Sequence, residues 1–256
     1  MKIVKNNISN IGRAPCDVDN LNDLPFIPVD PLPKKNFAMM LVGAPASGKT
    51  NMLLQLLLSH PTKKKKDIPL YFYGLFDNIT LISPSMATLP SVFLKKLDED
   101  NTHMKFSDQL VTDIIENLYD GENINSLLLL DDCVRDITRS KNLSKVFLNR
   151  RHCCHNDEKK TEDKPSNASL SIIVTNQKYS LLSLEFRNAL SDIIIFKCSN
   201  SNEINRIKDE LMADLDKNTQ DMLLDLAWKN KYSFLYVKPY MPLEDKYYIM
   251  FDKVVF

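Results

Sequence analysis

Short apolar runs alternate with amphipathic stretches from about residue 37 to the end of the chain. The apolar runs predict strands at residues 37–42, at either 70–73 or 79–82, and at 126–130, 171–175 and 192–196. The stretches with helical periodicity predict helices at residues 49–59, 107–119, 143–152, 185–189, 202–211 and 219–229, the second of them capped by Ser107. Strands that alternate with helices are typical of an α/β fold with a mostly parallel central sheet.

The two ends of the chain and one internal stretch depart from this alternation. The first 36 residues are rich in Asn, Asp and Pro and predict an extended N-terminal arm with little helix. Residues 37–256 are long enough for one domain with a substantial core. Within it, the segments 232–237 and 247–251 predict an edge hairpin added to the sheet, and the polar, mixed-charge stretch 157–169 predicts an insertion.

A glycine-containing loop joins the first predicted strand to the first predicted helix. It has the complete P-loop pattern G-x-x-x-x-G-K-[ST], in a chain with only five glycines. Backbone N–H groups of such a loop form an anion-binding nest, the lysine reaches the β- and γ-phosphates, and the threonine hydroxyl ligates Mg²⁺. The expected binding residues for a nucleoside triphosphate are Gly43, Ala44, Pro45, Ala46, Ser47, Gly48, Lys49, Thr50 and Asn51.

Two carboxylates end the predicted strand at 126–130. We expect Asp131 to hold Mg²⁺ through water, and Asp132 to orient or deprotonate the attacking water. A catalytic carboxylate at this point is typical of ATPases of the additional-strand class of P-loop NTPases. The alternative is that the pair only caps a following helix.

Further candidates follow the predicted strand at 171–175. Gln177 or Asn176 would contact the γ-phosphate or the attacking water, the alternative being a solvated strand end. The segment Asn176-Gln177-Lys178 lacks the Asn-Lys-x-Asp order of guanine specificity, so ATP is favoured over GTP.

Three arginines complete the candidate set. Arg150 and Arg151 lie at the end of a predicted helix, and Arg187 lies beyond the strand at 171–175. An arginine supplied from a neighbouring subunit neutralises charge in the transition state of phosphoryl transfer. The alternative for each of them is a solvated or salt-bridged helix face.

Charge and cysteine content narrow the class of protein. Lysine plus arginine equals aspartate plus glutamate at 33 each, so no global charge indicates indiscriminate coating of DNA. Five cysteines form no evident disulfide framework, and no apolar run is long enough to span a bilayer. We therefore expect a soluble protein of a reducing compartment.

The lysines at 63–66 predict a solvated turn, and the adjacent ligands of His152-Cys153-Cys154-His155 do not have zinc-site spacing.

Taken together, these motifs resemble the FtsK–HerA superfamily, and more narrowly the genome-packaging ATPases of large eukaryotic DNA viruses (poxvirus-like) and of virophages. The resemblance spans about residues 37–256 and depends on the P-loop, on 127–132, and on the segments Asn149-Arg150-Arg151-His152, Thr175-Asn176-Gln177 and Phe186-Arg187-Asn188. It implies an ATP-hydrolysing translocase of double-stranded DNA that forms a homo-oligomeric ring and contacts capsid or portal-type proteins. Its implied location is the viral assembly site in the host cytoplasm, and the virion.

Two features depart from that family. Asp132 stands where many members carry glutamate, and the insertion at 157–169 separates Arg150, which matches the family's trans arginine finger, from the strand at 171–175. The competing hypothesis is a nucleotide-dependent assembly or scaffold protein that does not pump DNA. A small-molecule kinase is disfavoured, because no arginine-rich lid follows the P-loop.

Overall fold

A computed structural model describes residues 1–4, 29–34, 36–59, 71–119, 125–133, 137–138, 140–150 and 169–256. In these residues ten strands form one sheet in the order β1-β10-β9-β8-β7-β2-β6-β5-β3-β4. The strands are β1 (Lys2–Val4), β2 (Ala38–Val42), β3 (Asn78–Ile82), β4 (Thr102–His103), β5 (Asn125–Asp131), β6 (Ser169–Asn176), β7 (Asp192–Phe196), β8 (Phe234–Val237), β9 (Tyr247–Ile249) and β10 (Asp252–Val255).

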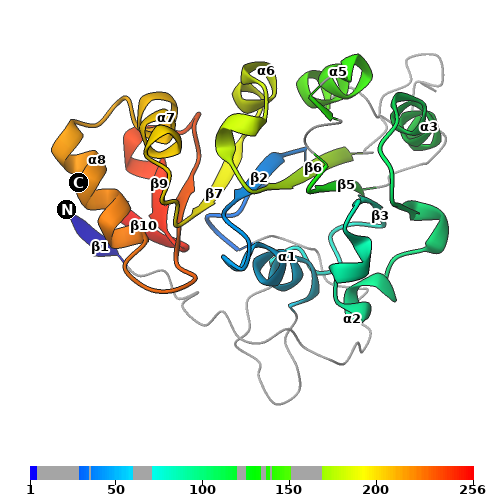
Figure 1. The fold of residues 1–256 in the computed structure, drawn as a ribbon, viewed down its shortest axis with the longest axis horizontal. Helices are drawn as coiled ribbons and strands as arrows, with labels where there is room; N and C mark the ends of the chain where they lie inside the picture. Colours follow the sequence, from blue (N-terminus) through cyan, green and yellow to red (C-terminus); the bar gives the residue numbers. More distant parts are fainter. Residues whose placement is uncertain are drawn as a thin grey trace, which may run out of the picture.

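The sheet has a parallel half and an antiparallel half. Strands β7, β2, β6, β5, β3 and β4 run parallel to their neighbours, whereas β8, β9, β10 and β1 continue the sheet in antiparallel pairs. The chain's two ends meet at one edge, where β1 pairs with β10 (Figure 1). The sheet is therefore the α/β, mostly parallel sheet of a P-loop NTPase, extended by a C-terminal antiparallel unit.

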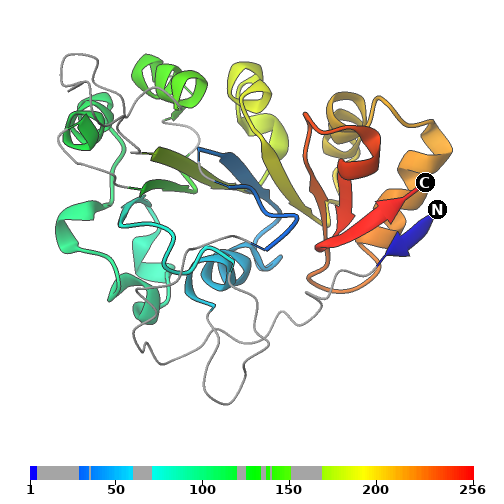
Figure 2. The same ribbon diagram turned by 180° about the vertical axis from the view of Figure 1, so that it is seen from behind.

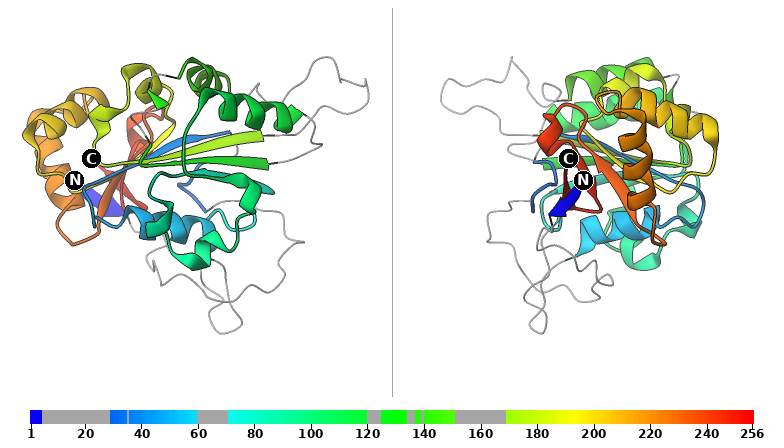
Figure 3. Two further views of the ribbon diagram at one scale, coloured as in Figure 1. Left: turned by 45° about the vertical axis from the view of Figure 1, so that its right-hand side comes forward. Right: turned by 90° about the vertical axis from the view of Figure 1, so that its left-hand side faces the viewer.

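Helices cover both faces of the sheet. They are α1 (Lys49–Leu58), α2 (Ser91–Leu94), α3 (Asp108–Tyr119), α5 (Lys141–Asn149), α6 (Leu184–Asn188), α7 (Ser201–Leu211) and α8 (Lys217–Ala227). Helices α3, α5 and α6 lie on one face and α1 with α2 on the other, as the view from behind also shows (Figure 2). The turned views show the parallel strands enclosed between these two layers (Figure 3).

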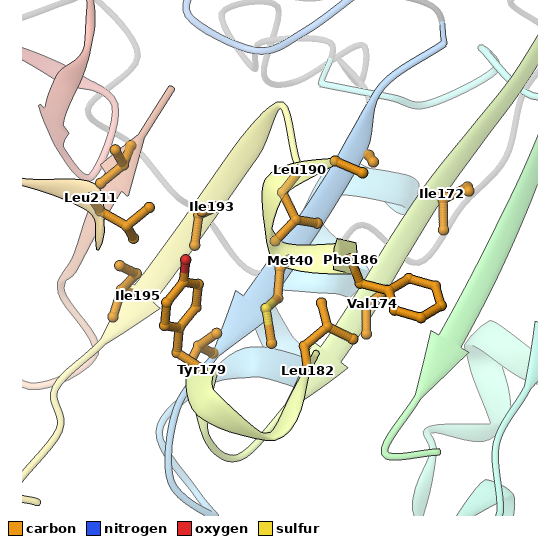
Figure 4. Close-up of a cluster of buried hydrophobic side chains, with 14 of the residues drawn as sticks. Met40, Ile172, Val174, Tyr179, Leu182, Phe186, Leu190, Ile193, Ile195 and Leu211 are labelled. Carbon is orange, nitrogen blue, oxygen red and sulfur yellow. The ribbon is translucent and has the colours of Figure 1, made fainter. Parts of the chain in front are cut away.

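Alternating side chains of the strands supply the two cores. Met40 of β2 packs with α5, α6 and α7 on one face, while Met39 and Leu41 pack with α1 and α2 on the other. In the first core, side chains of β2, β6 and β7 meet Phe186 and Leu211 from the covering helices (Figure 4). Burial on both faces is why these strands read as continuous apolar runs in the sequence.

Several element boundaries differ from the predictions for local reasons. Of the two options for one strand, residues 78–82 form it, and Tyr71–Tyr73 lie in a turn. Helix α5 starts two residues before the predicted 143 because the Ser140 hydroxyl accepts a hydrogen bond from the Leu143 N–H, at 3.0 Å. The Ser107 hydroxyl likewise accepts from the Leu110 N–H, as its predicted capping role requires.

The arm and the insertion are described only in part. Residues 2–4 form the edge strand β1, and Leu32 is buried in the core beside α1. The predicted insertion lies outside the described residues except for Ser169, which is buried and begins β6. The division into an arm (1–36) and an ATPase domain (37–256) remains a prediction.

Candidate nucleotide site

The P-loop connects the carboxyl end of β2 to the start of α1. The Gly43 N–H donates to the Asn176 carbonyl oxygen at 3.1 Å, which fixes the loop's first residue to β6. The Ser47 N–H donates to the Ala44 carbonyl at 3.1 Å, so the loop turns tightly before α1 begins. Its remaining N–H groups precede a helix N-terminus, where the helix dipole favours an anion.

Glycine is required at both ends of this loop. A Cβ on Gly43 would come within 2.8 Å of the Phe196 Cβ and would also collide with Ser47. Gly48 has φ 107°, a conformation that other residues adopt rarely. The Ser47 hydroxyl is buried and has no hydrogen-bond partner among the described residues. A phosphate in the loop would supply the missing partner, so the loop fits a polyphosphate.

Lys49 is half-buried, and its ammonium group donates to the carbonyl oxygens of Gly43 and Ala44 at 2.6 and 3.2 Å. Burial lowers the pKa of Lys49, and the negative charges of Asp132 and Asp131 oppose that shift. The ammonium group therefore lies between the P-loop backbone and the acidic end of β5, where it could contact the terminal phosphates of a nucleotide.

Asp131 is buried at the end of β5, and both of its carboxylate oxygens accept hydrogen bonds. The Ser83 hydroxyl, just after β3, donates at 2.8 Å, and the Thr175 hydroxyl on β6 donates at 2.5 Å. These two bonds orient the carboxylate from both sides. Oxygen ligands of this kind suit Mg²⁺, which keeps several of its waters, so Asp131 and the Thr50 hydroxyl could hold the metal.

Asp132 differs from Asp131 in its exposure and in its backbone conformation. It is exposed and has φ 51°, so its backbone is in the left-handed region. Partial burial of the carboxyl group and repulsion from Asp131 raise the pKa of Asp132. The positive charge of Lys49 and the Gln177 side chain lower this pKa by a smaller amount. A carboxylate so placed, with a pKa above that of an ordinary aspartate, could accept a proton from water.

The two polar residues at the end of β6 have different environments. The Asn176 side chain is buried: its amide donates to the Lys178 carbonyl at 2.7 Å and its oxygen accepts from the Gln177 N–H at 2.8 Å. Gln177 is exposed, and its side chain lies close enough to Asp132 to act on the pKa of that carboxyl. Of the two candidates for contact with the γ-phosphate or water, Gln177 lies in the better position, and Asn176 shapes the turn.

Arg150 lies at the opposite end of the strands. It is buried, and its Nε and Nη1 donate to the carbonyl oxygens of Asn36 and Phe147 at 2.9 and 2.8 Å. Asn36 precedes β2 and the P-loop follows β2. The five-residue strand therefore separates Arg150 from the P-loop of its own chain by about 16 Å. These two bonds join α5 to the chain before β2, and the expected role of Arg150 as an arginine finger toward a neighbouring subunit stays a prediction.

Arg187 is also buried, on α6. Its guanidinium forms a two-pronged ion pair with Glu210 of α7, at 2.8 Å from Nε and 2.7 Å from Nη2, and a further hydrogen bond to the Leu182 carbonyl. It lies over the Tyr179 ring, 5.2 Å from the centroid. These contacts match the salt-bridged alternative stated above for this residue, and they join α6 to α7.

Replacing Arg187 by alanine is expected to lower the free energy of unfolding by about 2–3 kcal/mol, because the partners of the lost guanidinium are partly buried. The control is Arg206→Ala. Arg206 pairs with the same Glu210 at 3.8 Å, but its side chain is 49% exposed, so this substitution should lower the free energy of unfolding by under about 0.5 kcal/mol. Denaturant unfolding measures both. A loss of ATPase activity in Arg187→Ala without loss of stability would instead support the finger role.

Other candidates lie outside the described residues: Arg151, the lysines at 63–66 and His152-Cys153-Cys154-His155. Among the residues that the structure describes, no cluster of three or more His, Cys, Asp or Glu side chains could hold a metal. Asp131 and Thr50 would therefore need nucleotide oxygens and water to complete a Mg²⁺ site, as is common for this ion. In the same described ranges, no helix is long and apolar enough to cross a membrane.

A cavity of about 710 Å³ lies beside the P-loop on its β7–β8 side. Residues 46–52 of the loop and α1 line one wall, and residues 230–234 with Phe196 and Met250 line the other. A second cavity of about 430 Å³ shares residues 46–47 and 230–233 and extends to Ala44, Lys197 and Trp228. The acidic residues are on the other side of β2, beyond β6.

Sequence reasoning missed three parts of this site. Ser83 and Thr175 orient Asp131, and a hydroxyl at the carboxyl end of each neighbouring strand was the available signal for them. The turn at 230–233 was assigned in part to a strand starting at 232. No local sequence signal brings this turn to the P-loop, because sheet order alone decides its position.

The fold and the loop together define the chain as having a P-loop NTPase fold of the additional-strand class, because β6 lies between the P-loop strand and the acidic strand. No protein-family model and no curated protein matches the sequence.

Among solved structures, the chain is similar to the genome packaging NTPase B204 from Sulfolobus turreted icosahedral virus 2 in complex with AMP, with a TM-score of 0.54 at 14% identity over 84% of this chain and 96% of that one. It is also similar to B204, the DNA-packaging ATPase from Sulfolobus turreted icosahedral virus, with a TM-score of 0.52 at 13% identity over 84% and 97%. The similarity to viral packaging ATPases expected from the sequence is thus confirmed at the level of fold.

Proposed function

We propose that this protein is an ATP-hydrolysing translocase that packages a double-stranded viral genome into a capsid. The observation that carries the proposal is the convergence of the P-loop, Asp131, Asp132 and Gln177 at the carboxyl ends of three adjacent strands. The overall similarity to the viral packaging NTPase B204, which was solved with AMP and also with AMPPCP (TM-score 0.50 for the latter), adds support from the fold.

Each residue would have a defined part in hydrolysis. The P-loop N–H groups and Lys49 would hold the β- and γ-phosphates. Asp132, positioned by Gln177, would accept a proton from the water that attacks the γ-phosphorus while the bond to the bridging oxygen breaks. Thr50 and Asp131 would hold Mg²⁺, which when bound would neutralise charge on the phosphate oxygens. Thr175 and Ser83 keep the Asp131 carboxylate oriented for that metal.

We further propose that the active form is a homo-oligomeric ring at the viral assembly site, in contact with capsid or portal-type proteins. An arginine from a neighbouring subunit would complete the site. We place Arg151 first among the three for this role, because both other guanidinium groups donate to partners within their own chain.

Duplex DNA is expected to stimulate ATP turnover several-fold, and the wild-type protein should bind it in a salt-dependent manner. Because binding releases counterions from the phosphates, affinity should fall roughly tenfold or more between 50 and 200 mM salt. Steady-state ATPase assays and filter binding at the two salt concentrations measure this.

The competing assembly or scaffold function predicts nucleotide-dependent association without any response to DNA. The balanced charge of 33 basic and 33 acidic residues is compatible with it. Light scattering with and without AMPPCP, run beside the DNA titration, separates the two. Association with ATP analogue and an unchanged turnover with DNA would reject the translocase.

A further inference from the structure

The 710 Å³ cavity beside the P-loop is large enough for the nucleoside part of a nucleotide. The P-loop at the end of β2 divides the site: Asp131, Asp132 and Gln177 follow β5 and β6 on one side, and the cavity lies toward β7 and β8 on the other. Figure 1 shows β2 between these two halves. With the γ-phosphate toward the acidic side, the base of a bound nucleotide would extend toward β8.

A tight turn between α8 and β8 forms the outer wall of this cavity. The Asn230 carbonyl accepts from both the Ser233 N–H, at 3.2 Å, and the Ser233 hydroxyl, at 2.7 Å, which closes the turn. Before it, the indole N–H of Trp228 donates to the Ile195 carbonyl at 3.1 Å and holds the end of α8 to β7. The two residues at the tip, Lys231 and Tyr232, are thereby held beside the P-loop.

Tyr232 contacts the P-loop directly and remains accessible. A Cβ on Gly48 would lie 3.3 Å from Tyr232 Cδ1, so the tyrosine lies against the glycine that precedes Lys49. The side chain is still 55% exposed. The Lys231 ammonium is 4.8 Å from the ring centroid and lies over one face of the ring.

Several residues that line this cavity have a left-handed backbone conformation. Five described non-glycine residues have a positive φ, and three of them, Ala46, Tyr232 and Met250, line this cavity. Tyr232 has φ 69° at a turn position that ordinarily takes glycine or asparagine. Backbone conformations of this kind cluster at ligand sites, where the surrounding structure maintains them.

We propose that the turn at 230–233 is the purine-base platform of the site, with the base stacked on Tyr232 across from Lys231. Phe196 and Met250 provide apolar contacts behind the base, and Gln55 and Ser233 bring amide and hydroxyl groups to its edge. Stacking favours purines because of their larger π surface. This inference rests on the proposed nucleotide function and assigns the residues that recognise the base.

Titration calorimetry of the full chain tests the platform with two probes, ATP–Mg²⁺ and inorganic tripolyphosphate. Tyr232→Gly accepts the positive φ and removes the whole side chain, whereas Tyr232→Phe keeps the ring and removes only the hydroxyl. We expect Tyr232→Gly to bind ATP roughly tenfold more weakly, with tripolyphosphate affinity unchanged and with the preference for ATP over CTP reduced. Tyr232→Phe should behave as wild type.

Tyr240→Ala is the matched control, because Tyr240 is 68% exposed in a different loop, and it should leave ATP affinity unchanged. Equal ATP affinities of wild type and Tyr232→Gly would overturn the platform while leaving the P-loop function intact. Failure of the wild type to bind either ATP or tripolyphosphate would overturn the nucleotide function itself, and the platform with it.

Discussion

Lys49→Ala is expected to reduce kcat for ATP hydrolysis by about 10²- to 10³-fold, the cost of removing one preorganised charge from a phosphoryl-transfer site. The ammonium now bonds to the Gly43 and Ala44 carbonyls and lies in the field of Asp131 and Asp132. Without it, the charge that builds up on the γ-phosphate oxygens would face two carboxylates with no lysine between them.

The fold should survive this change, since Lys49 is only half-buried at the start of α1 and alanine is a good helix former. Lys145→Ala, an exposed lysine on α5, is the control and should hydrolyse ATP at the wild-type rate. Malachite-green phosphate release measures turnover, and circular dichroism checks the fold. Turnover by Lys49→Ala at more than half the wild-type rate would contradict the assignment of this P-loop.

Asp132→Asn is expected to lower kcat by about 10³-fold and to leave the Kd for ATP–Mg²⁺ nearly unchanged, because it removes a general base and no phosphate ligand. Asparagine has the same shape and is among the few residues that readily adopt a positive φ, so the backbone at 51° should be retained. Single-turnover kinetics and calorimetry separate the two effects. A wild-type rate in Asp132→Asn would refute this residue as the catalytic base.

The neighbouring position should behave differently. Asp131→Asn places an amide group opposite the hydroxyls of Ser83 and Thr175, which now both donate to the carboxylate. We expect a higher Mg²⁺ concentration for half-maximal activity and a small loss of stability, about 1 kcal/mol. The contrast between the two aspartates distinguishes the metal position from the base position.

The pH profile gives an independent test of the same base. The pKa of Asp132 is raised in the folded protein, and only its ionised form can accept a proton. Activity should therefore be lost as pH falls through that raised pKa, at a pH above the value of about 4 for an ordinary aspartate. The acid limb of kcat/KM should be absent from the residual activity of Asp132→Asn.

The pattern of residues was sufficient to predict those parts of the site that are contiguous in the sequence. The P-loop joins β2 to α1, and Asp131 ends a buried strand, because strand, loop and helix are each specified by local periodicity and by glycine at positions of close approach. The position of β6 between β2 and β5 agrees with the additional-strand class predicted from the acidic end of β5.

Long-range pairing decided what the sequence could not. In the sequence, Arg150 and Arg187 cannot be told from an arginine finger, because a finger is also an arginine near a helix. Only the packing shows that Arg150 bonds to Asn36 and Arg187 to Glu210. Burial of a guanidinium depends on partners many residues away in the chain, and no local pattern encodes them.

The sequence by itself therefore indicated the class of chemistry: a nucleotide loop, a candidate metal carboxylate and a neighbouring candidate base, because each consists of a few consecutive residues at a strand end. Tertiary structure alone decided which side of β2 each group occupies, that Ser83 and Thr175 orient Asp131, and that the turn carrying Tyr232 lies against Gly48. Those contacts join segments from 44 to 184 residues apart in the chain, and only the order of strands in the sheet brings them together.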